Sequence, residues 1–449
     1  MSRMFGTDGV RGVANRELTP MLAMQLGMAG AYVLSKDADH RPVILVGCDT
    51  RRSGDMLANA IMAGACAVGA DVIYLGILPT PAVAFLAKKH GADAGVVISA
   101  SHNPMEFNGI KFFDGHGFKL PDEKEDEIQA EIESGMKDIT FPTGEGVGRV
   151  TYALDAWKEY VDHALELVPV RLTGFTFVVD TAEGASYKTN IEALERLGAK
   201  VIPIHNHPNG ININRNCGST HLEELKERVA AEHADAGFAF DGDADRFLAV
   251  DEKGEEVNGD TIMAIVAGRM KEKGTLRKNS IVVTVMSNLG LFVFGEENGI
   301  HIEKTKVGDR YVLERMREMG ANIGGEQSGH IILLDENTTG DGLLSCLHLA
   351  KAMAETGKPL SALASVCRMY PQALVNAHVD NTKKEHYSEY PEITSRIEAL
   401  EQEFAGKGRV LIRPSGTEPL VRVMIEGEDQ AAIQKKAEEL ADFIEKTMS

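Results

Sequence analysis

The stretch VILVGCDTRRSGDMLANAIMAGACAVGADVIYLG, residues 43–76, decides the fold class of this chain. It begins with an apolar, β-branched run and continues through a polar turn and an amphipathic segment. Gly-Ala then precedes a second apolar run. A strand, a crossover helix and a second strand in this order predict a βαβ unit with a mostly parallel sheet. Residues 43–76 therefore indicate an α/β protein.

The same pattern occurs twice more along the chain. FTFVVDTAEGASYKTNIEALERLGAKVIPI, residues 175–204, repeats it closely, and SIVVTVMSNLGLFVFGEENGIHIEKTKVGD, residues 280–309, repeats it more loosely. Three copies of one supersecondary pattern predict three similar α/β domains in series. One large doubly wound sheet is the alternative, and the linker-like stretches between the copies argue against it.

These stretches divide the chain into four predicted domains. TFPTGEGVGRV at residues 140–150 is rich in Gly and Pro, DEKGEEVNGD at 251–260 is polar, and a third break falls near Tyr370-Pro371. The segment after this break alternates short strand-like runs with two helical patterns, which predicts a smaller α+β domain. We expect domains at residues 1–150, 151–254, 255–370 and 371–449.

The charge balance restricts the partners of the protein. Forty-seven basic and 67 acidic residues give a formal net charge of −20. A field of that sign repels nucleic acids and anionic membranes, so we expect neither as a partner. A phosphate-bearing ligand must therefore be held by a local cluster of basic residues and backbone amides.

Cysteine usage and hydropathy predict a soluble, cytoplasmic protein. The five cysteines are scattered and show no CxxC spacing, which is typical of reduced thiols. The N-terminal MSRMFGTDGVRG has no apolar signal region, and the apolar stretch Met21 to Leu34 is too short to cross a membrane.

FAFDGDADRFLAV, residues 238–250, predicts a metal site. Asp241, Asp243 and Asp245 alternate with small residues, and three crowded carboxylates repel one another unless a cation lies among them. A hard cation with oxygen ligands, such as Mg²⁺, suits this donor set. An EF-hand loop is an alternative, with Glu252 at the twelfth position, but Arg246 replaces the required glycine at the sixth. A solvated acidic turn is the other alternative.

VVISASHNPMEFNGIK, residues 96–111, places Ser99 and Ser101 after an apolar run. A hydrolase serine needs a base within hydrogen-bond reach, and we expect the adjacent His102 to point elsewhere. The Gly-x-Ser-x-Gly elbow is also missing. A structural turn stiffened by Pro104 is one interpretation. The other is a phosphorylated serine, which would supply an anionic oxygen to the metal.

GGEQSGH, residues 324–330, places Glu326 and Ser328 between glycines. A carboxylate and a hydroxyl that the backbone can bring close to a ligand suit the recognition of sugar hydroxyls. A plain glycine turn is an equally good interpretation of this stretch alone.

RPSGTEP, residues 413–419, predicts an anion site. Arg413 supplies a planar guanidinium group, and Ser415, Gly416 and Thr417 supply backbone amides and hydroxyls in a predicted tight turn. Arg422 adds a second arginine on the following strand. A plain hairpin turn is the alternative. This loop is the local basic cluster that the acidic chain requires.

Arg11 and Lys111 lie beside glycines, in FGTDGVRG and GIKFF. Each is either an ordinary surface charge or a cation over a transferring phosphoryl group. Lys111 is a candidate acid or base, because we expect burial and neighbouring charges to lower the pKa of its ammonium group.

SASHNP, DGDADR, GGEQSGH and RPSGTEP occur in this order, one in each predicted domain, across nearly the whole chain. Together they resemble the α-D-phosphohexomutases. The resemblance implies an isomerase with three related α/β domains and a smaller C-terminal domain around a central cleft. It also implies a phosphoserine at Ser101 and a Mg²⁺ ion bound by Asp241, Asp243, Asp245 and the Ser101 phosphate.

The resemblance further assigns roles to the other loops. Glu326 and Ser328 are implied to recognise the sugar, and the substrate phosphate is implied to be bound by Arg413, Ser415, Gly416, Thr417 and Arg422. Arg11, Lys111, Arg246 and His330 match positions around the reacting phosphate. A sugar bisphosphate intermediate, formed from a hexosamine phosphate substrate, is implied as well.

Within the family, the chain is most similar to a bacterial branch in three features: FGTDGVRG, the alanine of DGDADR, and GGEQSGH. Enzymes of that branch interconvert glucosamine 6-phosphate and glucosamine 1-phosphate. This reaction is a step in the synthesis of UDP-N-acetylglucosamine and peptidoglycan precursors. Asp309 in TKVGDRY replaces a histidine of the branch that acts on glucose and mannose phosphates. Three alternatives to a glucosamine-phosphate mutase stay open. They are a mutase of the glucose and mannose phosphate branch, a metal-dependent sugar phosphatase and a non-catalytic binding protein. The protein is expected to be a monomer or a homodimer.

Overall fold

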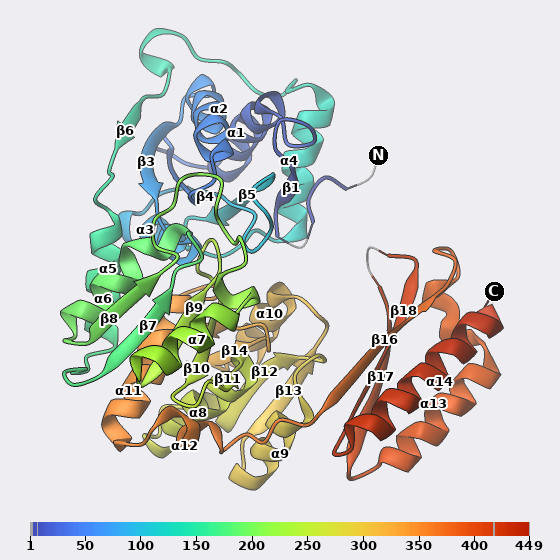
Figure 1. Ribbon diagram of the computed structural model, residues 1–449. Helices are drawn as coiled ribbons and strands as arrows, with labels where there is room; N and C mark the ends of the chain where they lie inside the picture. Colours follow the sequence, from blue (N-terminus) through green and yellow to red (C-terminus); the bar gives the residue numbers. More distant parts are fainter. Residues whose placement is uncertain (1–2, 7, 416–417, 449) are drawn as a thin grey trace. The chain divides into compact units, whose positions relative to one another are not determined.

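The computed structural model describes residues 3–6, 8–415 and 418–448 (Figure 1). The chain forms two compact units. The first contains Met1–Met286 and Gly299–Val366, and the second contains Ser287–Asn298 and Cys367–Ser449. The predicted residues Gly416 and Thr417 lie outside the described part of the chain.

The first sheet has six strands in the order β1-β5-β4-β2-β3-β6. Strand β2 is parallel to β3 and β4, whereas β5 is antiparallel to both β4 and β1. The strands are β1 (Val10–Val13), β2 (Val43–Cys48), β3 (Asp71–Ile77), β4 (Ala94–Ile98), β5 (Phe107–Asp114) and β6 (Val150–Tyr152). The helices of this region are α1 (Pro20–Ser35), α2 (Ser53–Ala67), α3 (Thr80–His90) and α4 (Asp122–Ser134).

Local sequence explains how α1 begins and how it packs. The side chain of Thr19 accepts a hydrogen bond from the Leu22 amide, and Pro20 occupies the first turn, where its missing N–H is not needed. Helices α1 and α2 then approach closely at Gly27, where an added Cβ would lie 2.3 Å from the Ile61 carbonyl oxygen. A larger side chain at position 27 would therefore push the two helices apart.

The second sheet has the order β11-β10-β9-β7-β8, and the third has the order β13-β12-β14-β15. Their strands are β7 (Thr176–Asp180), β8 (Lys200–Ile204), β9 (Ala236–Phe240), β10 (Phe247–Asp251), β11 (Glu256–Val257), β12 (Ser280–Thr284), β13 (His301–Thr305), β14 (Ile323–Gly325) and β15 (Ile331–Leu333). The helices between α4 and the C-terminal segment are α5 (Trp157–Leu167), α6 (Thr189–Arg196), α7 (Glu223–Glu232), α8 (Gly259–Glu272), α9 (Leu289–Asn298), α10 (Asp309–Met319), α11 (Gly342–Thr356) and α12 (Leu360–Ala364).

The three sheets share one topology. In each, a first strand is parallel to the second and third strands, and a fourth strand returns antiparallel to the third: β2-β3-β4-β5, β7-β8-β9-β10 and β12-β13-β14-β15. The prediction of three similar α/β domains is confirmed. We expected mostly parallel sheets, and the antiparallel fourth strand was not predicted. The βαβ pattern covers only the first three strands of each sheet, so it carries no information on the fourth.

The second unit contains the C-terminal α+β segment, as predicted. Strands β16 (Gln372–His378), β18 (Leu420–Gly427) and β17 (Gly408–Pro414) form an antiparallel sheet in that order. Helix α14 (Gln430–Met448) packs on β16 and β18, and α13 (Pro391–Phe404) packs on β17. Their apolar side chains form a separate hydrophobic core.

Short 3-10 helices join some of these elements: η1 (Gly144–Gly146), η2 (Ala185–Tyr187), η3 (Gly218–Thr220), η4 (Arg277–Asn279) and η5 (Lys384–Glu389). Among the helices in the described ranges, none combines the length and the apolar character that crossing a membrane requires. The predicted domain boundaries remain predictions.

Candidate active site

Three equivalent turns carry most of the predicted site residues. The turn between the third and fourth strands holds Ser101 in the first sheet, the aspartates in the second, and Glu326 to His330 in the third. Ser101 and Ala244 both adopt positive φ, 50° and 55°. Non-glycine residues in this region store strain, and such residues concentrate at functional sites. The repeated fold therefore places a turn with predicted site residues at the same position in each sheet.

The Ser101 hydroxyl lies against the acidic turn. Ser101 is only 2% exposed, and its Oγ donates a hydrogen bond to Asp241 Oδ2. His102 Nδ1 lies 3.4 Å from the same Oγ, so the expectation that His102 points elsewhere was wrong. Burial, together with the charges of Arg246 and Arg11, lowers the pKa of His102 to about 4. His102 is thus neutral at pH 7 and a weak base.

The three aspartates form a buried cluster that could hold a metal ion. One carboxylate oxygen of each lies within 4.8 Å of the others, and Oδ1 of Asp243 and Oδ1 of Asp245 are buried without a hydrogen-bond partner. Burial, followed by repulsion from Asp245 and Asp243, raises the pKa of Asp241 well above its usual range. Unpartnered carboxylate oxygens in a repulsive cluster fit a hard cation.

The structure excludes both alternatives for this turn. The strands on either side, β9 and β10, are antiparallel neighbours, whereas an EF-hand loop joins two helices. The carboxylates are buried, with at most 4% exposure, so they are not a solvated acidic turn.

The raised pKa of Asp241 predicts a pH-dependent stability effect in metal-free protein. The folded pKa lies above the unfolded value, so the stability that Asp241 contributes is present at low pH and lost as pH rises through the folded pKa. In EDTA, the stability of D241N relative to wild type should therefore increase between pH 4 and pH 8. Urea unfolding at the two pH values measures this difference. A constant difference would contradict the repulsion in the cluster.

Lys111 is the cation of this cluster. Its Nζ, on a side chain only 2% exposed, lies 2.8 Å from Asp243 Oδ2, 2.9 Å from Asp8 Oδ2 and 3.7 Å from Asp245 Oδ2. Burial alone would lower the pKa of Lys111, but the three carboxylates outweigh it and raise the pKa. The expectation of a lowered pKa was therefore wrong, and Lys111 is a stable ammonium ion at neutral pH.

A second buried network joins the first through Asp8. Lys119 Nζ donates to Asp8 Oδ1 at 2.7 Å and to Asp309 Oδ2 at 2.5 Å. His330 Nε2 lies 3.4 Å from Asp309 Oδ2 and 3.8 Å from Asp245 Oδ2. Asp309 thus lies beside the predicted His330, whose two ring nitrogens are buried without a hydrogen-bond partner.

The predicted arginines lie at the edge of these networks. Arg11 pairs with Asp8, and the backbone amide of Arg246 donates to Asp241 Oδ1 at 3.1 Å. The Nε atoms of Arg11 and Arg246 are buried without a hydrogen-bond partner. Guanidinium groups with a free donor suit the binding of an anion such as a phosphoryl group.

Sequence reasoning missed the buried ion pair that holds the Ser101 turn. Arg51 Nε donates to Asp49 Oδ2 at 2.9 Å, and both side chains are fully buried. The terminal guanidinium nitrogens donate to four carbonyl oxygens of the turn, those of Ser101, Asn103, Pro104 and Phe107. Asp49 also accepts from Ser99 Oγ, which in turn accepts from the Ser101 amide. Ser99 therefore has a supporting role.

Replacing Arg51 by lysine tests whether the guanidinium group of Arg51 holds the Ser101 turn in place. An ammonium group cannot reach four carbonyl oxygens and Asp49 at once, so we expect Ser101 to shift and kcat to fall about 100-fold. The KM should change little, because Arg51 holds the turn and not the substrate. Steady-state kinetics of R51K measures both values, and R52K, at the exposed neighbour, is the matched control. A loss confined to KM would contradict a positioning role.

Glu326 and Ser328 lie together in the third turn. Glu326 Oε1 accepts from the Gly308 amide at 3.2 Å, and Ser328 Oγ lies 3.4 Å from Glu326 Oε2. Glu326 is half-buried and Ser328 is exposed. The pair thus presents a carboxylate and a hydroxyl at a solvent-accessible position.

Three of the residues predicted to bind a phosphate, Arg413, Ser415 and Arg422, lie in the second unit. Arg413 on β17 and Arg422 on β18 are direct cross-strand neighbours, and burial and the Arg422 charge lower the pKa of Arg413. Arg422 pairs with Glu418 at 2.9 Å, whereas Arg413 Nε is buried without a hydrogen-bond partner and suits an anion. Ser415, which is buried, donates its amide to Leu420 O and accepts from the Glu418 amide through Oγ.

Family comparisons cover most of the chain. Residues 2–138, 158–254 and 258–370 match phosphoglucomutase/phosphomannomutase alpha/beta/alpha domains I, II and III, and residues 374–443 match the C-terminal domain of the same family.

Full-length relatives and solved structures agree with these matches. The chain is 57% identical over 446 residues to a phosphoglucosamine mutase of Clostridium kluyveri, covering 99% of each chain. It is 55% identical over 449 residues to that of Ruminiclostridium cellulolyticum, covering 100% of each. The fold is similar to a phosphoglucomutase/phosphomannomutase family protein of Burkholderia thailandensis (TM-score 0.83, 23% identity, coverage 100% and 99%). It is also similar to Aspergillus fumigatus N-acetylphosphoglucosamine mutase in complex with GlcNAc-6P and magnesium (TM-score 0.71, 17% identity, coverage 99% and 96%).

Proposed function

Because this chain belongs to the phosphoglucomutase/phosphomannomutase family, we propose that it is a phosphoglucosamine mutase, an isomerase that interconverts glucosamine 6-phosphate and glucosamine 1-phosphate. The observation that carries the chemistry is the buried Ser101 hydroxyl against Asp241, in a cluster of three carboxylates. The choice of sugar is supported by the full-length relatives of 55–57% identity that carry this name. The product would lead to UDP-N-acetylglucosamine and peptidoglycan precursors.

Asp241, Asp243 and Asp245 are proposed to bind Mg²⁺, together with a phosphate on Ser101. The unpartnered carboxylate oxygens of Asp243 and Asp245 support this assignment, and oxygen ligands suit a hard cation. When bound, the ion would stabilise negative charge on the transferring phosphoryl group.

Ser101 is proposed to carry the phosphoryl group that is transferred. Its O–P bond breaks as the free sugar hydroxyl forms a new O–P bond, which gives a sugar bisphosphate. After the bisphosphate reorients, its other phosphate returns to Ser101, and the isomeric monophosphate is released. Arg11 and Arg246, with their unpartnered Nε atoms, would bind the phosphoryl oxygens during transfer.

His330 is the proposed group that moves the hydroxyl proton. A carboxylate, Asp309, lies 3.4 Å from its Nε2 and can stabilise the imidazolium that forms. Lys111 would remain a cation through the reaction, because three carboxylates surround it. Its role would be to neutralise the aspartates and to stabilise the phosphoryl group.

Substrate binding is assigned to the two remaining loops. Glu326 and Ser328 would bind sugar hydroxyls. Arg413 and Arg422, together with Ser415, Gly416 and Thr417, would bind the phosphate that is not reacting. A single anion site can serve both orientations of the bisphosphate, because it binds whichever phosphate lies away from Ser101.

A kinetic comparison tests this function. The purified protein, with catalytic sugar bisphosphate, is assayed on glucosamine, glucose and mannose 6-phosphates, with Mg²⁺ and with EDTA. We expect kcat/KM to be highest for glucosamine 6-phosphate and to be lost in EDTA. Comparable rates on all three sugars would undo the glucosamine assignment. Release of inorganic phosphate equal to substrate loss would indicate a phosphatase, and binding without turnover would indicate a sugar-phosphate-binding protein.

A further inference from the structure

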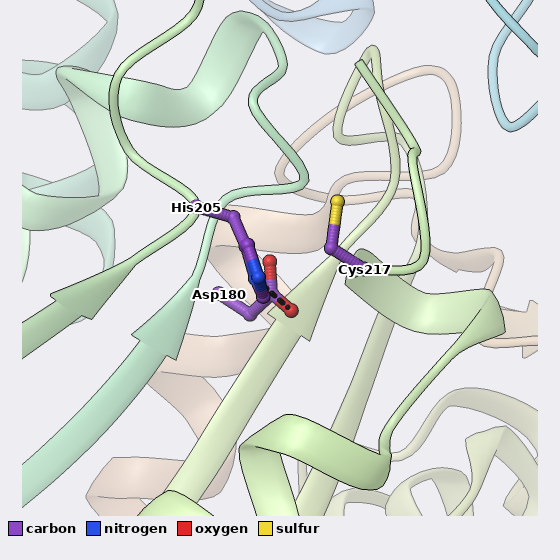
Figure 2. Close-up of side chains that lie close together, drawn as sticks. All are labelled: Asp180, His205 and Cys217. Atoms are coloured by element: carbon purple, nitrogen blue, oxygen red, sulfur yellow. Dashed lines mark ion pairs between the residues drawn. The ribbon is translucent and has the colours of Figure 1, made fainter. Parts of the chain in front are cut away.

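A second cluster of metal-ligating side chains lies at the carboxyl end of the second sheet (Figure 2). Asp180 is the last residue of β7, His205 follows the last residue of the neighbouring parallel strand β8, and Cys217 directly precedes η3. One ligand atom from each residue lies within 4.8 Å of the others. Figure 2 shows the Asp180 and His205 side chains in contact, with Cys217 on the adjacent loop.

The donor set indicates the class of ion. A thiolate, an imidazole and a carboxylate are the ligands of Zn²⁺ sites, whereas Mg²⁺ and Ca²⁺ take oxygen ligands. At ordinary zinc bond lengths, tetrahedral N, O and S ligands lie about 3.4 to 3.6 Å apart, so closure shortens the present separations by about 1.4 Å at most. His205 Nδ1 already lies 3.0 Å from Asp180 Oδ2.

The surroundings of the cluster also match a metal site. A metal-binding histidine usually donates its other ring N–H to a carboxylate, and His205 Nε2 lies 3.0 Å from Glu224 Oε2. The amides of Ala182 and Gly218 donate to the Asp180 carboxylate, both at 2.8 Å, and so hold its orientation. His205 Nδ1 is buried, and it is paired with Asp180 Oδ2 at 3.0 Å. The two ring nitrogens are thus divided between a proposed ligand, Asp180, and an orienting carboxylate, Glu224.

The geometry argues against a nucleophilic cysteine. A cysteine nucleophile needs a histidine base, but the two ring nitrogens of His205 face Asp180 and Glu224. Cys217 is 1% exposed, and burial raises the pKa of its thiol. A buried thiol of this kind is inert as a nucleophile.

We propose that Asp180, His205 and Cys217 bind one zinc-class divalent cation, with Glu224 orienting the imidazole. The ion displaces the proton of the Cys217 thiol, and three protein ligands leave one tetrahedral position for solvent.

The position of the site gives the ion a structural role near the reaction. His205 and Cys217 bracket the segment that contains Asn214, whose Nδ2 donates to Ser101 O at 2.8 Å and to Asn103 O at 3.1 Å. An ion that ties both ends of this segment to β7 would stabilise Asn214 against the Ser101 turn. The site supports the fold of the turn and does not touch the reacting groups.

Cobalt substitution distinguishes this site from the aspartate cluster. Metal-free protein is titrated with Co²⁺, and a thiolate-to-cobalt charge-transfer band is expected at one equivalent. The three aspartates supply only oxygen ligands and cannot give that band. Zn²⁺ should abolish the band stoichiometrically and raise Tm. The band should be missing in C217A and present in C346A, which removes another buried thiol.

A second test uses a substitution on the protein surface, so its result does not depend on changing a buried residue. E224Q alters an exposed helix residue and should weaken Zn²⁺ binding 10- to 100-fold in competition with a chromophoric chelator. Its neighbour E223Q, also exposed, should bind as wild type does. Wild-type protein without a thiolate-to-cobalt band, or an equal band in C217A, would overturn the proposal. Equal zinc affinity in E224Q and wild type would overturn the role of Glu224.

Discussion

The Ser101→Ala variant should lose at least about four orders of magnitude in kcat for isomerisation, even with sugar bisphosphate supplied. Alanine removes the oxygen that carries the phosphoryl group, and no other hydroxyl in the described turn can replace it, since Ser99 Oγ is already bonded to Asp49. Coupled assay of glucosamine 1-phosphate formation measures kcat. Phosphate transfer from labelled bisphosphate to the protein should disappear in parallel.

Ser99→Ala is the matched control for the loss of a hydroxyl. Ser99 Oγ accepts from the Ser101 amide at 2.9 Å, so its removal should disturb the turn without removing the phosphoryl acceptor. A loss of about 10- to 100-fold in kcat, with labelling retained, is expected. Equal losses for both variants, or isomerisation retained by S101A, would refute the phosphoserine mechanism.

The Lys111→Met variant should lose both activity and stability. Methionine removes the cation that lies between Asp8, Asp243 and Asp245 and leaves three buried carboxylates without it. Breaking a buried ion pair from one side destabilises a protein by about 3–5 kcal/mol, so the urea midpoint should fall accordingly. Isomerisation should fall at least about 1,000-fold, because a cation beside the phosphoryl group is also lost.

A double variant separates the two effects. Lys111→Met combined with Asp243→Asn removes both partners of the 2.8 Å pair, so part of the lost stability should return. Activity should stay low, because the double variant lacks a metal ligand and a cation. Recovery of activity together with stability would show that Lys111 has only a structural role.

The fold was largely predictable because its signals are local. Apolar runs, polar turns and Gly-Ala steps in residues 43–76, 175–204 and 280–309 depend only on neighbouring residues, and the three sheets follow them. The antiparallel fourth strand was not predicted. Its pairing partner is decided by the turn geometry at Ser101, Asp241 to Arg246 and Glu326 to His330, which hydropathy does not encode.

The candidate site was predictable only where its residues share a short motif. The three aspartates are visible in DGDADR. Lys119, in contrast, lies 111 residues from Asp8 and 190 residues from Asp309, and the three join only in the folded chain. The role of Arg51 was equally unpredictable from the sequence. Its carbonyl acceptors come 50 to 56 residues later, and nothing in TRRSG distinguishes it from the exposed Arg52.

By itself, the sequence determined the three α/β repeats, the C-terminal α+β segment and the family, because each depends on patterns within a few tens of residues. Only the tertiary structure decided how charges from distant segments add together. The pKa of Lys111 rises instead of falling because carboxylates from Asp8, Asp243 and Asp245 surround its ammonium group at once and outweigh its burial. These carboxylates come from two segments that are distant from Lys111 in the sequence, so no single segment shows their combined effect.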